Sequence, residues 1–288
     1  MDILITGILL GAAYSLIAMG LTLQYGVARI MNLANGEMLV AGAFGAFWVF
    51  TTLKLTPYLA MFFVVPGAFV FNWLIYRYLL RPLVRRAKNR GMLEVDSILA
   101  TFGMSFILVG FMLMIFGGDF FAYSYLAEPF EIFESTFGLN RVVGCMISVL
   151  ICGLLYLGLN KTRTGMAIRA VAVDPAAAGL VAIDVPRVSA FSFALGGAVT
   201  AAGGVVLSTF LTMDASIGII FTMKALIIVI MGGVGDIRGA IVAALILGLA
   251  ETIVASLIDP GLTLAAAYLL FILILLFRPE GLLGRRQS

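Results

Sequence analysis

The amino-acid sequence predicts an all-α fold, a polytopic transmembrane helix bundle of about eight or nine spans with short helices on its cytoplasmic side. Hydrophobic residues make up 62% of the chain and charged residues only 11%, against about 45–50% and about 25% in an ordinary soluble domain. The apolar residues form long runs, and the basic residues gather between particular pairs of runs. A water-soluble globule of 288 residues could not bury this much apolar surface, so we expect one transmembrane domain, residues 1–288, solvated by lipid.

Nine apolar segments are candidates for spans of roughly 20 residues. The second and seventh are the weakest, because Asn32, Asn35, Gly36 and Glu37 crowd the start of the second and Lys224 interrupts the seventh. The nine segments are residues 3–25, 36–53, 58–80, 97–116, 142–159, 188–211, 217–231, 240–258 and 262–277.

The basic residues predict the orientation, because they accumulate on the cytoplasmic side of membrane proteins. In a nine-span arrangement, three basic clusters fall on one side, and the N-terminus is then outside and the C-terminus cytoplasmic. The clusters are Arg77, Arg81, Arg85, Arg86, Lys88 and Arg90; Lys161, Arg163, Arg169 and Arg187; and Arg278, Arg285 and Arg286. The opposite side carries mainly acidic residues: Asp119, Glu128, Glu131, Glu134, Asp214 and Asp259.

The composition argues against chemistry performed by this chain. Histidine is absent, which removes the commonest metal ligand and general base. Cys145 and Cys152 lie in one apolar run, roughly 10 Å apart along a helix axis, too far for a disulfide. The acidic start at Asp2 is unlike a signal peptide, so we expect the first segment to be retained. We predict no enzyme activity, no metal site and no cofactor bound by this chain.

The segment 117–141 is external, acidic and aromatic. Its aromatic side chains form either an interfacial cap that meets a partner or a belt at the lipid headgroups, which is the simpler interpretation. They are Phe120, Phe121, Tyr123, Tyr125, Phe130, Phe133 and Phe137.

The internal segment 161–187 predicts two short helices, residues 164–173 and 176–182. Asp174 suits an N-cap and Pro175 the first helical position. The segment either docks in a groove of a soluble protein or is an ordinary connecting loop.

The segment 30–42 places Asn32, Asn35 and Glu37 near the cytoplasmic start of the second span. Polar groups at membrane depth usually face a bundle interior or a water-filled path. Gly36 can interrupt the helix, and such irregular backbone is tolerated where it lines protein or a cavity. The alternative is a helix cap at the interface.

In the segment 223–239, Lys224 precedes paired glycines too closely for a full crossing, so residues 217–222 are expected to form a separate half-helix or re-entrant piece. Interrupted segments in the two halves of a transporter indicate the substrate path. This region therefore adds Lys224, Gly232, Gly233, Gly235 and Asp236 to the candidate path. Alternatively, Lys224 snorkels outward and the glycines permit close packing. Glu251 is a possible partner for Lys224.

Four stretches in this order resemble the permease family of branched-chain amino-acid ABC importers, of the LivH-like type. They are GAAYSLIAMGLTLQYGVARIMNLANGE (11–37), TRTGMAIRAVAVDPAAAGLVAIDVPRV (162–188), KALIIVIMGGVGDIRGAIVAALILGLAE (224–251) and RPEGLLG (278–284). The chain lacks GxxxxGK[ST], the phosphate-binding loop of an ATPase, so ATP and Mg would be bound by another chain.

The resemblance implies a bacterial inner-membrane complex that imports a branched-chain or other amino acid. Its partners would be a second, LivM-like permease subunit, two cytoplasmic ATPase subunits and a periplasmic solute-binding protein, besides membrane lipid; no nucleic acid is expected. The helices in 161–187 would be coupling helices that contact the ATPase through Arg169, Asp174, Ala177, Gly179 and Asp184.

One position departs from the family pattern. Asn35 in NLANGE stands where the family commonly has a histidine, and relatives also carry urea, short amides or aromatic acids. These substrates remain alternatives within the same importer class. A different class, an ion-coupled secondary transporter or channel, would use Glu37 or Lys224 in an ion relay and need no ATPase.

Overall fold

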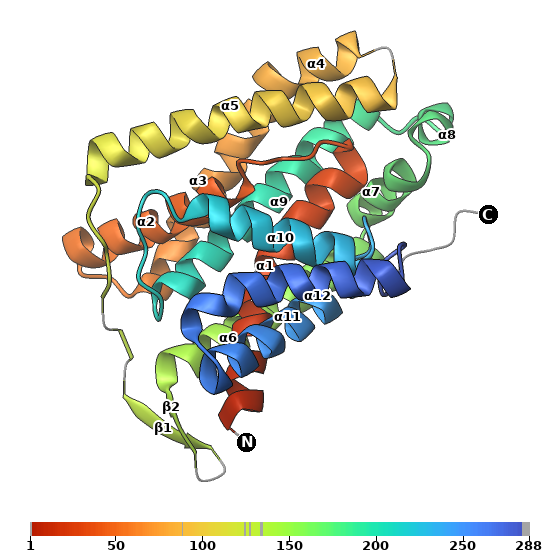
Figure 1. Cartoon of the computed structure of the whole chain (residues 1–288). Coiled ribbons are helices and arrows are strands. Elements are labelled where there is room, and N and C mark those ends of the chain that lie inside the picture. Colours follow the sequence, from red (N-terminus) through yellow and green to blue (C-terminus); the bar gives the residue numbers. More distant parts are fainter. Residues whose placement is uncertain (1, 88, 124, 127, 133–134, 284–288) are drawn as a thin grey trace.

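The computed structural model describes residues 2–87, 89–123, 125–126, 128–132 and 135–283, and it is almost entirely helical (Figure 1). Within this part of the chain, eight helices are long and apolar enough to cross a membrane, and one shorter apolar helix, Gly218–Gly232, joins them. The predicted all-α polytopic bundle of about eight or nine spans is confirmed.

The apolar helices agree with the expected segments to within several residues at most boundaries. They are α1 (Asp2–Ala28), α2 (Asn35–Leu53), α3 (Pro57–Ile75), α5 (Arg90–Phe116), α6 (Leu139–Lys161), α9 (Val185–Ser208), α10 (Gly218–Gly232), α11 (Ile237–Leu257) and α12 (Thr263–Phe277). α3 continues through a π-helical turn, η1 (Tyr76–Leu80), into α4 (Arg81–Arg86). The shorter elements are α7 (Arg163–Val173), α8 (Pro175–Leu180), the 3-10 turn η2 (Pro260–Leu262), and the strands β1 (Pro129–Ile132) and β2 (Ser135–Gly138).

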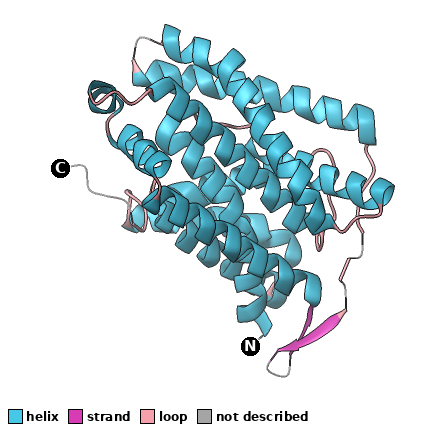
Figure 2. Cartoon of the chain, turned by 180° about the vertical axis from the view of Figure 1, so that it is seen from behind, coloured by secondary structure: helices cyan, strands magenta, loops and turns pink. Residues whose placement is uncertain are grey.

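The bundle has two ends, which we name the hairpin end and the α7–α8 end. The hairpin end carries the antiparallel pair β1–β2 and the start of α1 (Figures 1 and 2). The other end carries α7 and α8, and the chain after α12 returns there, because the Leu282 N–H donates to the Met231 carbonyl at the end of α10 over 2.7 Å. The N-terminal and C-terminal segments therefore lie at opposite ends.

α1 and α9 form the centre of the bundle, and glycines let their neighbours approach. A Cβ at Gly204 of α9 would collide with the Leu39 carbonyl of α2. On the other side of α1, the backbones of Gly11 and Gly248 of α11 are in similar contact. In lipid the hydrophobic effect does not drive helices together, so van der Waals contact between closely packed backbones contributes to their association instead.

The seventh apolar segment differs from the expectation. A separate half-helix at residues 217–222 is wrong: α10 runs unbroken through Lys224. The charge does not break the helix, because Lys224 points into the bundle and meets a carboxylate there. The glycine pair ends the helix instead, with Gly233 at φ +103°.

The aromatic segment after α5 folds back onto the hairpin end. The rings of Phe121, Tyr123 and Tyr125 contact Phe44, Phe47, Phe50, Tyr58 and Phe116, and Phe121 pairs with Met213 as a β-bridge. Burial raises the pKa of Tyr123 to about 12, so its phenol stays protonated and shares a 2.8 Å hydrogen bond with Ser208. These three aromatic residues thus cover the bundle, whereas Phe120 is exposed; contact with a partner stays a prediction.

Several residues named above lie outside the described residues: Lys88, Phe133, Glu134, Arg285 and Arg286.

Candidate functional site

The chain turns back into the bundle after α1. Residues 29–34 are irregular, and α2 begins at Asn35, whose Oδ1 accepts a 3.0 Å hydrogen bond from Thr200. Thr200 lies about 22 Å along α9 from its first residue, at 1.5 Å per residue. α2 therefore begins deep inside the bundle, and a helix cap at the membrane interface does not describe this region.

Two threonines from other helices satisfy the backbone of this irregular segment. Thr222 of α10 accepts from the Gly36 N–H at 2.8 Å and donates to the Leu33 carbonyl at 3.1 Å. Thr101 of α5 accepts from the Leu33 N–H and lies 3.1 Å from the Met31 carbonyl. Buried backbone groups must find such partners where water is excluded.

Asn32 closes a chain of amide hydrogen bonds at the same level. Its Nδ2 donates to Gln24 Oε1 at 3.0 Å, and its Oδ1 accepts from the Ala34 N–H at 3.0 Å. Gln24 in turn donates to the Phe193 carbonyl at 3.2 Å. Asn32 is thus fully engaged in holding the turn between α1 and α2.

Glu37 is 2% exposed and lies against the first turn of α10. Its carboxylate touches Gly218, where any side chain would collide with it. The positive end of a helix stabilises a carboxylate. Glu37 Oε2 and Asn35 Nδ2 nevertheless have no hydrogen-bond partner among the described residues. One acceptor and one donor inside the bundle are therefore buried without a partner among the described residues.

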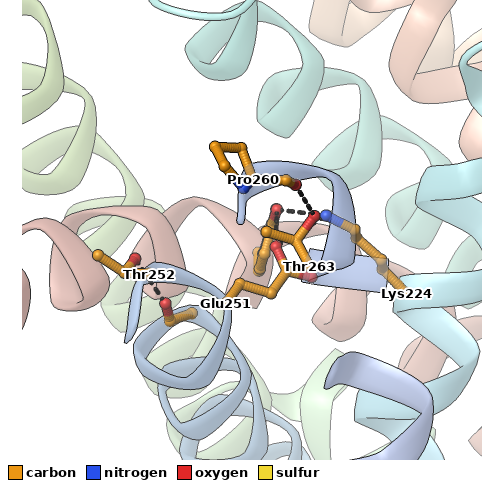
Figure 3. A network of polar contacts seen from close by, with 7 residues as sticks. Lys224, Glu251, Thr252, Pro260 and Thr263 are labelled. Atoms are coloured by element: carbon orange, nitrogen blue, oxygen red, sulfur yellow. Dashed lines mark hydrogen bonds and ion pairs between the residues drawn. The ribbon is translucent and has the colours of Figure 1, made fainter. Parts of the chain in front are cut away.

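Lys224 forms a second polar cluster with Glu251 (Figure 3), and Tyr14 is its third member. Its Nζ is 2.8 Å from Glu251 Oε2 and 2.8 Å from the Tyr14 hydroxyl, which donates to the same Oε2 at 2.8 Å. The predicted partner Glu251 is confirmed, and outward snorkelling of Lys224 is wrong, since its side chain is only 11% exposed. The cluster joins α1, α10 and α11.

A cavity of about 210 Å³ adjoins this cluster towards the hairpin end. Its lining is mainly apolar and includes the charged residues Arg141 and Glu251. Glu251 Oε1 has no hydrogen-bond partner in the described chain. The lining residues are Thr6, Leu9, Leu10, Arg141, Phe210, Leu211, Glu251, Thr252, Ala255 and Thr263.

The glycine turn after α10 lies apart from Asn35 and Glu37, at the α7–α8 end. Gly232 packs against Gly239, Gly233 and Gly235 take positive φ, and Asp236 caps α11 by accepting from Gly239 at 3.1 Å. These residues form a tight turn between two packed helices. The structure does not bring them to the polar interior, so their place in a path stays a prediction.

The two short helices of 161–187 are present as α7 and α8. Asp174 Oδ1 caps α8 by accepting from Ala176 and Ala177, and Asp184 caps α9 and pairs with Arg187 at 2.9 Å. Arg169 donates weakly to the Asn160 carbonyl at 3.4 Å. Ala177 and Gly179 are exposed, and a Cβ at Gly179 would meet nothing within 4 Å.

An apolar surface surrounds α8. Leu180 is 89% exposed, and Val173, Val181 and Met166 are also exposed. α7 is held to the bundle from the other side, where Arg29 donates to the Ala172 carbonyl at 3.0 Å. The pair α7–α8 therefore presents exposed apolar side chains, and docking of a partner on them stays a prediction.

The polar partners Gln24, Thr101, Thr200, Thr222 and Tyr14 were not anticipated. Each is a hydrogen-bonding residue inside an otherwise apolar run, and that is the one signal in the sequence that could have singled them out.

A multi-pass bundle with unsatisfied polar groups in its interior is the architecture of a membrane transport protein. The sequence matches the family described as "Branched-chain amino acid transport system / permease component" over residues 3–277. The chain belongs to this family and is a membrane permease component.

Similar proteins align along nearly the whole chain. The high-affinity branched-chain amino acid transport system permease protein LivH of Escherichia coli K12 is 30% identical, covering 98% of this chain and 94% of the relative. BraD of Pseudomonas aeruginosa is 30% identical, covering 99% and 95%. The solved structure of PsaBC from Streptococcus pneumoniae in complex with Fab has a TM-score of 0.52 at 10% identity, covering 97% of this chain and 93% of that one, and shows similarity of fold alone.

Proposed function

We propose that this chain is the membrane-spanning subunit of an ATP-binding-cassette importer that moves a branched-chain or other small amino acid into the cytoplasm. The observation that carries the proposal is the family match over residues 3–277, with relatives of the same described function aligned along almost their full length. In this proposal the chain catalyses no reaction and binds no cofactor; ATP and Mg belong to partner ATPase subunits.

The proposed path passes the start of α2. Asn32, Asn35 and Glu37 lie on irregular or helix-starting backbone between α1, α9 and α10, and Lys224 lies further along α10. Asn35 Nδ2 and Glu37 Oε2 would be free to exchange hydrogen bonds with a passing solute. Small shifts of α10 against α2 would open or close this route, because Gly36 and Gly218 are in direct contact.

The proposed coupling surface is the α7–α8 end. Arg169, Asp174, Ala177, Gly179 and Asp184 would lie at or beside the contact with the ATPase subunits, with the exposed Leu180 side chain as its apolar anchor. That end would then be cytoplasmic and the hairpin end would face the solute-binding protein, with the N-terminus outside. The basic residues support this orientation.

The test is uptake by the assembled importer in proteoliposomes. The chain is purified with its second permease, the ATPases and the binding protein, and ATP-driven uptake of labelled leucine, isoleucine and valine is compared with that of urea, acetamide and phenylalanine. We expect uptake of the aliphatic amino acids alone, dependent on ATP. Uptake of urea, acetamide or phenylalanine instead would assign the substrate to one of the alternatives within the same importer class.

A second arm tests the mechanism. The purified chain alone, under a sodium or proton gradient, should give no uptake; gradient-driven uptake would overturn the proposal in favour of a secondary transporter. In the full complex, Arg169→Ala should lower uptake per ATP hydrolysed without lowering complex yield. Unchanged coupling in that variant would remove the α7–α8 surface from the proposal.

A further inference from the structure

A cavity of about 310 Å³ opens on the helix that runs through α3, η1 and α4. It lies towards the α7–α8 end, since Tyr76 packs on Phe193 in the first part of α9. Six residues line it, four of them arginines: Arg77, Tyr78, Arg81, Pro82, Arg85 and Arg86. The lining contains no acidic residue.

The local sequence explains how the arginines come together. Pro82 has no N–H to donate and its ring crowds the preceding turn, and the helix responds by widening into the π-helical turn Tyr76–Leu80. The Arg81 N–H accordingly bonds back to the Tyr76 carbonyl. Arg77, Arg81 and Arg85 follow at intervals of four residues, so successive guanidinium groups lie on neighbouring positions of one helix face.

This arrangement lacks a counter-charge. Like charges at this spacing repel, and among the described residues none of the four arginines takes part in an ion pair. Arg81 Nε is shielded from solvent and has no acceptor in the described part of the chain. An anion in the cavity would supply both the charge and the acceptors.

The surroundings are those of a lipid-facing helix. Only 11% of the apolar window of Pro57–Arg86 is buried in the protein, and Tyr78 and Leu79 beside the cavity are exposed. The Arg77 guanidinium lies 5.2 Å from the Trp73 ring and 5.9 Å from the Tyr78 ring. Tryptophan and tyrosine are typical of the headgroup level, so acyl chains would run along α3 while the headgroup faces the arginines.

We propose that this cavity binds the phosphate headgroup of an anionic phospholipid in the leaflet at the α7–α8 end. The planar guanidinium fork matches phosphate oxygens in pairs. Arg77 lies near two aromatic rings, and Arg81 and Arg85 extend the donor surface along the helix. The inference rests on the multi-pass membrane fold and not on the transported solute.

The experiment is native mass spectrometry of the full chain in non-ionic detergent, titrated with phosphatidylglycerol or with phosphatidylcholine. We expect one tightly bound phosphatidylglycerol and no comparable phosphatidylcholine. Arg81→Gln with Arg85→Gln should weaken phosphatidylglycerol binding about tenfold or more, since each basic residue near a lipid surface contributes on the order of a factor of five. Arg81→Lys with Arg85→Lys keeps the charge and should show an intermediate loss.

The matched control is Arg163→Gln with Arg187→Gln, two exposed arginines at the same end outside the cavity, which should change the affinity less than twofold. Equal losses of phosphatidylglycerol affinity in both pairs would reduce the effect to general electrostatic attraction and overturn the proposal.

Complete displacement of the lipid by inorganic phosphate would assign the cavity to a free anion. Loss of the lipid on assembly with the ATPase subunits would assign it to a protein partner. Thermal unfolding of each variant identifies any that is misfolded. If the glutamine pair is misfolded, the phosphatidylglycerol affinity of the lysine pair tests the proposal instead.

Discussion

The inner and outer helices of this bundle are almost equally hydrophobic but differ greatly in burial. α1 has a mean hydropathy of 2.0 with 67% of its apolar window buried, whereas Pro57–Arg86 has a mean hydropathy of 1.9 with 11% buried. α9, with the lower hydropathy of 1.8, is 89% buried. Hydrophobicity therefore identifies the spans and says little about which of them is central. Small residues and interior hydrogen bonds determine which helices lie at the centre, because lipid solvates apolar side chains as well as protein does.

Removing a charge from the inner cluster should have the largest effect. Lys224→Met leaves the Glu251 carboxylate buried beside Tyr14 without its cation. Breaking a buried ion pair in this way costs about 3–5 kcal/mol, so we expect a large fall in the thermal unfolding temperature of the purified chain in detergent.

The double variant Lys224→Met with Glu251→Gln removes both charges and should recover much of the loss. Lys161→Met, at an exposed position, is the control and should change stability by less than about 0.5 kcal/mol. A single variant as stable as the wild type would show that the inner helices do not depend on the pair.

Glycine substitution tests the difference between inner and outer helices directly. Gly204→Val in α9 forces a side chain into the Leu39 carbonyl of α2, and backbone cannot yield as a side chain can. We expect a loss of about 3 kcal/mol, at the upper end for overpacking. The same change at Gly110 of α5, where a Cβ meets nothing within 4 Å, should be nearly neutral. Equal effects at the two positions would contradict the division into inner and outer helices.

The sequence was sufficient for the spans and for the short helices α7 and α8, because both depend on local signals. Apolar run length located the helices, and Asp174 with Pro175 marked the start of α8. The continuity of α10 does not follow from the local sequence, although Glu251 could be named as a partner. Whether Lys224 interrupts the helix depends on the fold, which brings Glu251 and Tyr14 together around its charge.

The polar interior was predicted only in part for the same reason. Asn32, Asn35 and Glu37 stand out because they are adjacent in sequence. Thr101 and Thr222 hold the same turn from α5 and α10. Their position in apolar runs marks them as polar residues at membrane depth, but it does not indicate which turn they support. The depth at which α2 begins follows from pairing with α9, which the sequence does not encode locally.

Removing one of these threonines gives a smaller effect. Thr222→Val keeps the shape but leaves the Gly36 N–H and the Leu33 carbonyl without their partner. We expect about 1–3 kcal/mol of destabilisation, with a clear fall in uptake, because the start of α2 loses its support against α10. Uptake and thermal unfolding are measured on the same preparation. Thr51→Val, which removes only two exposed hydrogen bonds within α2, should leave both unchanged. A similar loss there would make the effect of Thr222 unspecific.

The smallest change in stability is expected at α8, a short helix that buries Ala178 alone and begins at a capping side chain. Asp174→Ala removes the acceptor for the Ala176 and Ala177 N–H groups, at a cost of about 1 kcal/mol confined to α8. Hydrogen exchange of residues 175–180 should become faster while the unfolding temperature stays constant, and uptake per ATP hydrolysed should fall. Asp174→Asn retains capping and should restore both exchange and coupling. If the asparagine variant restores exchange but not coupling, the carboxylate itself contacts the partner, and this surface depends on charge as well as on helix geometry.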